Sequence, residues 1–168
     1  MTDLAGLIVF LLSSFLAAGI GGAITARSVR TWYLTLRKPT WNPPARLFGP
    51  VWSVLYLLMA IAAWLVWRGR DAADVRAALA LYAAQLALNV LWSFLFFGLR
   101  RPSTALIEIA LLWFAIAATI AAFWPIDRTA AALLLPYLAW VGFATVLNRS
   151  IARSNPGAPA RASTSATG

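Results

Sequence analysis

The chain has 168 residues, of which 62% are hydrophobic and 11% charged, whereas soluble domains are about 45–50% apolar and about 25% charged. This composition excludes an ordinary soluble domain and indicates a protein that folds in lipid. The formal net charge is +9, but the basic residues lie between apolar stretches, so nucleic acid is not an expected partner. The chain has no cysteine and no histidine, which excludes disulfides and the usual Cys- or His-based catalytic sets.

The apolar stretches are continuous and do not alternate with polar residues, so they predict membrane-spanning helices. A helix needs about 20 apolar residues to cross the hydrocarbon core. We predict an all-α membrane protein, a bundle of five transmembrane helices that forms one domain over residues 1–150. The predicted spans are residues 4–26, 47–67, 77–99, 103–124 and 129–148. Residues 151–168 are rich in Ala, Ser, Pro and Gly and are predicted to be a disordered C-terminal tail.

The distribution of charge predicts the orientation in the membrane. Most of the 14 Lys and Arg residues fall in the first loop, in the third loop and after the last span. Because cytoplasmic loops carry an excess of Lys and Arg, we expect these segments, with the C-terminus, on the cytoplasmic side. The opposite side also holds Asp residues, which offset its arginines.

Three spans carry a polar and aromatic face at helical spacing. These faces are Trp52, Tyr56, Met59 and Ala63 in the second span, Gln85, Asn89, Trp92 and Phe96 in the third, and Tyr137, Trp140, Ala144 and Asn148 in the fifth. At 1.5 Å rise per residue, their three tryptophans lie at similar depth, roughly 8–12 Å from the cytoplasmic boundary. Buried amides and hydroxyls are costly when they face lipid, so the three faces are predicted to meet inside the bundle. They either join the helices by packing and hydrogen bonds, or they form a pocket with aromatic walls and a few polar groups that orient a ligand.

Several segments resemble the translocator protein, or tryptophan-rich sensory protein, family. The matching motifs run from Lys38-Pro39-Thr40-Trp41-Asn42-Pro43-Pro44 and Gly49-Pro50-Val51-Trp52 through Gln85-Leu86-Ala87-Leu88-Asn89-Val90-Leu91-Trp92 to Pro136-Tyr137-Leu138-Ala139-Trp140 and Leu147-Asn148. They occur in the order typical of that family.

The resemblance implies a membrane receptor or sensor that binds porphyrin, of the protoporphyrin IX type, and other hydrophobic small molecules, and that forms a homodimer. It places the ligand cavity at Trp52, Asn89, Trp92 and Trp140, with Phe48, Gly49, Val51, Ala144 and Leu147 as lining; Tyr56 and Tyr137 join them from the faces described above. The first loop would cover the mouth of this cavity. No cofactor and no metal site is expected.

Two positions depart from the resemblance or lack an obvious role. The sterol-recognition pattern of animal members needs a tyrosine where Arg149 stands, so sterol is a doubtful ligand here. Glu108 is the one acidic residue well inside a predicted span. It either lies in the first turn and reaches toward the lipid headgroups, favoured by the helix dipole, or pairs with a cation of the first loop.

The expected activity is binding and not classical catalysis. Some members of the family are linked to light-dependent porphyrin breakdown, which Trp52 and Trp140 would carry here as a secondary activity. The alternative function is a transporter of porphyrins or related hydrophobic molecules, although no internal repeat of the kind common in transporters is visible. We expect a multi-pass protein of a bacterial cell membrane. Its dimer surface is predicted on the small residues of the third span, Ala80, Ala83, Ala84 and Ala87, with the Ala18 to Ala23 stretch of the first span as the competing surface.

Overall fold

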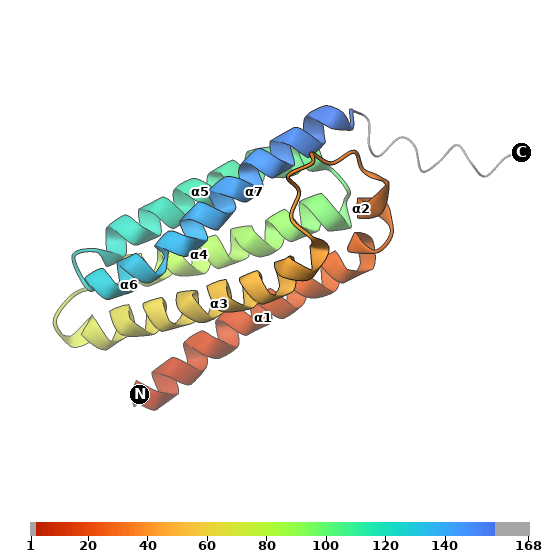
Figure 1. The fold of residues 1–168 in the computed structure, drawn as a ribbon. Coiled ribbons are helices and arrows are strands. Elements are labelled where there is room, and N and C mark those ends of the chain that lie inside the picture. The colour runs from red at the N-terminus through yellow and green to blue at the C-terminus, as the bar shows by residue number, and fades with distance from the viewer. Residues whose placement is uncertain (1–2, 157–168) are drawn as a thin grey trace, which may run out of the picture.

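A computed structural model describes residues 3–156 and folds them into a bundle of helices (Figure 1). The elements are α1 (Asp3–Val29), α2 (Trp32–Thr35), α3 (Ala45–Arg68), the 3₁₀ turn η1 (Gly69–Asp71), α4 (Arg76–Ser93), the π-helical turn η2 (Phe94–Gly98), α5 (Pro102–Phe123), α6 (Arg128–Leu133) and α7 (Leu135–Ser154). Five segments are long and apolar enough to cross a membrane: Asp3–Val29, Ala45–Asp71, Arg76–Gly98, Pro102–Phe123 and Arg128–Ser154. The predicted all-α bundle of five spans is confirmed.

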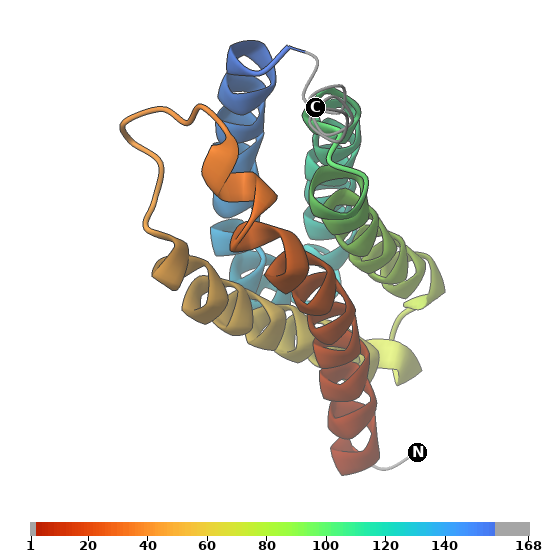
Figure 2. The same cartoon turned by 90° about the vertical axis from the view of Figure 1, so that its right-hand side faces the viewer.

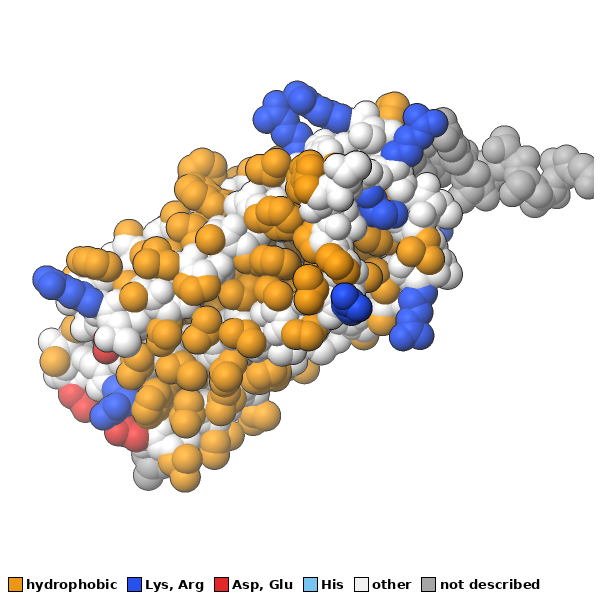
Figure 3. Space-filling model, viewed as in Figure 1, with side chains coloured by type: hydrophobic (Ala, Val, Ile, Leu, Met, Phe, Trp, Pro, Cys, Tyr) orange, Lys and Arg blue, Asp and Glu red, His pale blue; other side chains and the backbone are white. Residues whose placement is uncertain are grey.

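The five spans are packed as a closed ring. Helix α1 contacts α3 and α4, α5 contacts α4 and α7, and α6 closes the ring against α3. Both ends of the ring carry charged side chains, and a broad band of hydrophobic side chains lies between them (Figure 3). Leu12, Leu16, Ile107 and Phe114, on the outer surfaces of α1 and α5, are each at least 66% exposed. Exposed apolar residues in such number need lipid around them.

The fifth span is broken, which its apolar pattern did not predict. Helix α6 ends at Leu133 and α7 begins at Leu135, with Pro136 in its first turn. Proline has no N–H to donate and its ring crowds the preceding turn, so a continuous helix through this point is disfavoured. The break puts α6 against α3 at one end of the bundle and α7 against α5 along most of its length.

The third span ends in a π-helical turn. The Leu99 N–H donates to the Phe94 carbonyl at 2.7 Å, and Arg100 then adopts a φ of 56°. A π turn is wider than a turn of α-helix, so successive side chains point in more similar directions. Phe96 and Phe97 are both buried although they are adjacent in the sequence.

The first loop covers one end of the ring, which we call the first-loop end; the opposite end is the far end. After α2, residues 36–44 arch outward beside α7 before reaching α3 (Figure 2). Helix α7 continues to Ser154, past its predicted end at 148, so residues 151–154 are helical and not part of a disordered tail. The remainder of that predicted tail, residues 157–168, lies outside the described residues.

Candidate ligand-binding site

A chain of hydrogen bonds joins the three predicted faces at the centre of the bundle. Tyr56 of α3 donates its hydroxyl proton to Asn89 Oδ1 of α4 at 2.7 Å. Asn89 Nδ2 donates to the hydroxyl of Tyr137 on α7 at 2.8 Å. All three side chains are buried, with exposed fractions of at most 4%. The faces inferred from helical spacing therefore converge, because each supplies one member of this chain.

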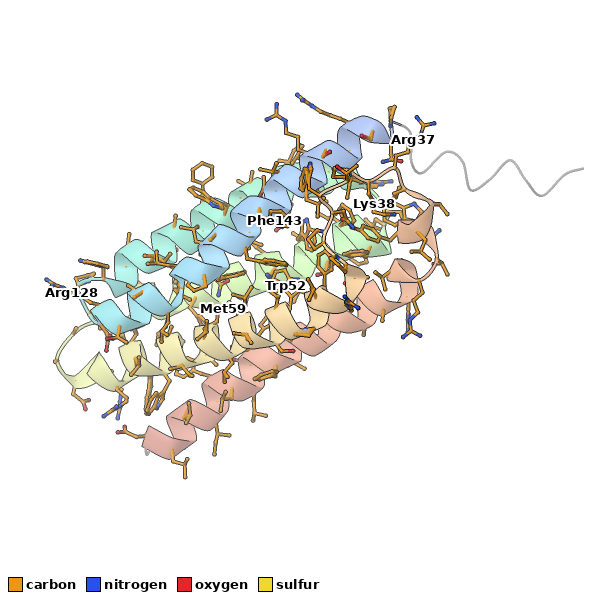
Figure 4. All side chains as sticks on the ribbon, viewed as in Figure 1. Arg37, Lys38, Trp52, Met59, Arg128 and Phe143 are labelled. Carbon is orange, nitrogen blue, oxygen red and sulfur yellow. The ribbon has the colours of Figure 1, made fainter. Side chains whose placement is uncertain are left out.

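Aromatic rings surround that polar chain. The Trp52 ring lies with its centroid 5.8 Å from Tyr56 and 6.2 Å from Tyr137. On α4, Trp92 stacks on Phe96 at 5.4 Å. Figure 4 shows Trp52 and Met59 on the same helix, α3. The arrangement offers flat π faces beside a few polar atoms, which is the composition typical of small-molecule sites.

A cavity of about 380 Å³ opens beside this cluster, between α1, α3, α4 and Tyr33 of α2. Its wall on the α1 side consists of small or short side chains, which leave the room that larger residues would fill. Those residues are Ala18, Gly21, Gly22, Thr25, Ala26 and Val29. The volume falls within the roughly 300–1,000 Å³ of ligand pockets in general.

The predicted site residues divide between this cavity and the packing behind it. Those that line it are Phe48, Gly49, Trp52, Tyr56, Asn89 and Trp92. The others are not in the lining. Tyr137 lies behind Asn89. Three more pack against the core, namely Val51, Trp140 and Ala144. Leu147 is buried near Tyr33 and Phe96. The fifth span thus supports the cavity wall and does not form it in this structure.

The contribution of α1 and of Tyr33 to the cavity was not predicted from the sequence. The α1 residues carry no aromatic or polar signal, and their only mark is a run of small side chains, which equally indicates helix packing. Tyr33 lies in the expected lid, and its hydroxyl donates to Asn42 Oδ1 at 2.8 Å. Burial raises the pKa of Tyr33 to about 12. The Tyr33 hydroxyl therefore stays protonated, and can donate a hydrogen bond, at any physiological pH.

The first loop is fixed by hydrogen bonds at several points. Lys38 Nζ donates to the Tyr33 and Leu36 carbonyls at 2.7 and 3.1 Å, which satisfies acceptors at the end of α2. Asn155, just after α7, accepts from the Arg37 N–H at 3.0 Å and donates to the Arg37 carbonyl at 2.9 Å. Figure 4 places Arg37 and Lys38 together at this end of the bundle. The loop is thus attached both to its own helix and to the segment just after α7.

Aromatic contacts connect the same loop to α7. Trp41 lies 5.8 Å from Phe143, and Phe143 lies 5.6 Å from Trp140. Trp140 in turn contacts Phe48 at 6.1 Å. Trp140 therefore links the loop to the start of α3, next to the cavity.

Comparison with known proteins identifies the family of the chain. A model of the TspO/MBR family matches residues 8–153. The chain belongs to the TspO/MBR family. It is 43% identical to the tryptophan-rich protein TspO of Chlorobaculum tepidum, over 84% of this chain and 90% of that protein. It is 40% identical to the human translocator protein, over 88% and 89%, and 43% identical to the tryptophan-rich sensory protein of Cereibacter sphaeroides, over 84% and 89%. Family membership and the five apolar spans together make the chain an integral, multi-pass membrane protein.

One buried polar group in this TspO/MBR chain matches neither expectation for it. Glu108 of α5 is only 5% exposed, so it does not reach the headgroup region. It forms no ion pair with a first-loop cation; the ion pairs among residues 3–156 are Arg68–Asp3, Arg70–Asp71 and Arg76–Asp74. Both carboxyl oxygens are buried without a hydrogen-bond partner in the described part of the chain.

The site offers stacking faces, amide and hydroxyl groups, and little else. Residues 3–156 contain no group of three or more side chains that could hold a metal ion. Trp92 Nε1 and Trp140 Nε1 are buried donors without a partner among these residues, and buried donors normally have one. The cavity lining therefore includes flat aromatic faces and a buried donor without a partner among the described residues, Trp92 Nε1.

Proposed function

We propose that this protein is a membrane sensor that binds porphyrin, or a similar flat hydrophobic molecule, in the cavity between α1, α3 and α4. The observation that carries the proposal is the buried chain Tyr56–Asn89–Tyr137, set among tryptophan rings beside a cavity of about 380 Å³. A conjugated macrocycle gains from stacking on Trp52 and Trp92. Asn89 can direct its remaining amide hydrogen at the ligand.

Charge at the cavity mouth supports a ligand with acidic groups. Three exposed arginines directly follow lining residues: Arg27 follows Ala26, Arg30 follows Val29, and Arg46 follows Ala45. A porphyrin of the protoporphyrin IX type carries two propionates at one edge. With its ring in the cavity, those propionates would lie at the first-loop end among the arginines, where a charge-assisted hydrogen bond contributes more than a neutral one.

The relatives' names point to the same class of function. One relative is a tryptophan-rich sensory protein and another a translocator protein. We favour sensing for this chain because the residues that line its cavity all come from the half of the bundle nearest the first-loop end. We place that end in the cytoplasm from the excess of Lys and Arg there.

The test is a titration of the purified protein with protoporphyrin IX, in which binding is measured as quenching of the fluorescence of its nine tryptophans. Trp52→Ala removes a ring that lines the cavity and should weaken binding by about 2 kcal/mol, roughly 30-fold. Trp140→Ala should have a smaller effect, because Trp140 does not line the cavity and contacts the lining residue Phe48. The control is Trp124→Ala, because Trp124 is 52% exposed at the far end. Equal affinities for the parent and Trp52→Ala would refute the assignment of the cavity.

A further inference from the structure

Helices α1 and α3 pack together near the far end of the bundle and diverge toward the first-loop end. Near the far end, Trp67 occupies the space beside Gly6, and its ring lies 6.5 Å from that of Phe10. Toward the other end α1 packs on η2, where Ser28 Oγ donates to the Phe97 carbonyl at 2.7 Å. Figure 2 shows the two helices crossing. The gap between them therefore widens toward the first-loop end, and the cavity lies in it.

This gap is open to the outside of the bundle. Five small residues that line the cavity are exposed: Gly22 and Ala26 on α1, and Ala45, Gly49 and Ser53 on α3. A Cβ atom added at Gly22 or Gly49 would meet nothing within 4 Å. Because α1 and α3 are neighbours in the ring, the medium outside their gap is the hydrocarbon of the bilayer. The cavity is therefore accessible from the membrane, between two helices.

Hydroxyl groups on the cavity wall are bonded within the protein. Tyr56 donates to Asn89 Oδ1 at 2.7 Å, and Ser93 Oγ donates to the Asn89 carbonyl at 3.3 Å. Ser53 Oγ donates to the Gly49 carbonyl at 3.0 Å. Most of the remaining wall is apolar. An empty space here would deprive the wall of contacts, whereas a hydrocarbon chain would supply them and needs no hydrogen bond.

Two arginines stand at the edges of the gap, at its first-loop end. Arg46 shares a face of α3 with Gly49 and Ser53, at positions i, i+3 and i+7. Arg30 directly follows α1, four residues after Ala26. Both arginines are exposed, and neither forms an ion pair among residues 3–156. An anionic group at this end of the gap therefore finds a cation on each helix.

We propose that the gap between α1 and α3 is a binding site for an anionic phospholipid of the bilayer. One acyl chain lies in the cavity, and the headgroup phosphate lies against Arg30 and Arg46. Along α3, Tyr56 is about 15 Å deeper than Arg46, so the cavity takes the upper part of an acyl chain. Basic clusters at the cytoplasmic ends of spans commonly recognise acidic headgroups.

Two further features fit this occupant. Trp92 Nε1 is a buried donor on the cavity wall without a partner among the described residues, and a lipid ester carbonyl is an acceptor. An anionic headgroup is favoured over a zwitterionic one, because the ammonium group of phosphatidylcholine would meet the arginines. The lipid occupies the cavity that we assign to porphyrin, so the two ligands exclude each other. Only this last consequence rests on the proposed function.

The first test uses native mass spectrometry of the delipidated protein, titrated with phosphatidylglycerol. Gly22→Leu and Gly49→Leu each put a side chain into the gap, and each should weaken the tightest-bound lipid about tenfold. The matched control is Gly19→Leu. Gly19 is also an exposed glycine of α1 with nothing near an added Cβ, but it does not line the cavity, so this variant should bind as the parent does. Equal affinity in all four proteins would overturn the proposal.

The second test concerns the headgroup. The parent should bind phosphatidylglycerol about tenfold more tightly than phosphatidylcholine with the same acyl chains. Combining Arg30→Gln with Arg46→Gln should reduce this preference to about twofold or less. The control pair is Arg149→Gln with Arg153→Gln, two exposed arginines of α7, a helix that does not line the cavity; it should keep the preference. A preference that survives the loss of Arg30 and Arg46 would overturn the headgroup assignment.

The third test places the acyl chain inside the cavity. Phosphatidylglycerol with brominated acyl chains quenches the tryptophans that those chains touch. The part of the emission that Trp52→Phe removes belongs to Trp52, which lines the cavity, and brominated lipid should quench it. The same quenching should disappear in the Gly49→Leu background, where the gap is filled. Unquenched Trp52 emission in the parent would overturn the proposal, and no porphyrin is present, so this result is independent of the proposed function.

Discussion

The side chain of Asn155 should determine how often the first loop opens. Its carboxamide accepts from the Arg37 N–H and donates to the Arg37 carbonyl, at 3.0 and 2.9 Å. Asn155→Ala removes both bonds, and also the bond from Asn155 Nδ2 to the Ile151 carbonyl at 2.8 Å, while leaving the loop sequence unchanged. The other attachments of the loop stay in place; they are the hydrogen bonds of Lys38, the Tyr33–Asn42 hydrogen bond and the Trp41–Phe143 contact. The loop should therefore open more often without unfolding the bundle.

The size of the effect follows from the two lost bonds. A net hydrogen bond contributes about 0.5–1.5 kcal/mol, and the lower half of that range applies because Asn155 is partly exposed. Together the two bonds stabilise the closed loop by about 1–2 kcal/mol. The equilibrium for loop opening should rise roughly 5- to 30-fold.

Hydrogen–deuterium exchange measures that equilibrium directly. The amides of residues 36–44 should exchange faster in Asn155→Ala by the same factor, while the amides of α4 keep their parental rates. The matched control is Ser154→Ala, an exposed neighbour with no side-chain hydrogen bond among the described residues. Loop exchange that is unchanged in Asn155→Ala would refute the view of Asn155 as the attachment of the loop.

Two further predictions concern the loop tyrosine and the dimer. Burial raises the pKa of Tyr33 to about 12. The neutral hydroxyl therefore stabilises the fold fully below the pKa of the unfolded chain, near 10, and this contribution is lost as the pH rises toward 12. The difference between phenolate absorbance titrations of the parent and of Tyr33→Phe should show one late-titrating group, and its absence would contradict the burial of Tyr33. For the dimer, Ala83 on α4 and Gly19 on α1 are both exposed, and a Cβ atom added at Gly19 would meet nothing within 4 Å. Ala83→Phe should abolish crosslinking in native membranes while Gly19→Phe preserves it, and the opposite result would move the dimer surface to α1.

The spans and the central polar chain could be predicted because their signals are local and periodic. Uninterrupted apolar stretches of about 20 residues have one interpretation in a protein of this composition. Tyr56, Asn89 and Tyr137 each lie on a face that repeats at helical spacing, and a polar group in lipid must find a polar partner. Spacing and desolvation together are enough to bring such residues into one place.

What could not be predicted depends on contacts between helices that carry no sequence signal. The α1 wall of the cavity consists of small residues, and the same residues serve equally well in helix packing. The sequence places Glu108 in the first turns of a helix, where the dipole and the nearby headgroups dominate any interpretation. Its actual environment is set by which side of α5 faces α4 and α7, and that rotation depends on packing along the whole helix.

The difference between the two halves of the bundle bears on the choice between sensing and transport. At the first-loop end, the interior holds the cavity, the tryptophans and the polar chain. Toward the far end, the interior of α3 consists of Ala60, Ala62, Ala63 and Val66, all with 0% exposed, and α6 packs against that helix. Passage of a porphyrin through this half would require α3 and α6 to separate and would expose tightly packed apolar surface. A site confined to one half of the bundle, with close-packed alanines in the other half, is suited to holding a ligand and reporting its presence. This asymmetry is the structural reason for favouring a sensor over a carrier.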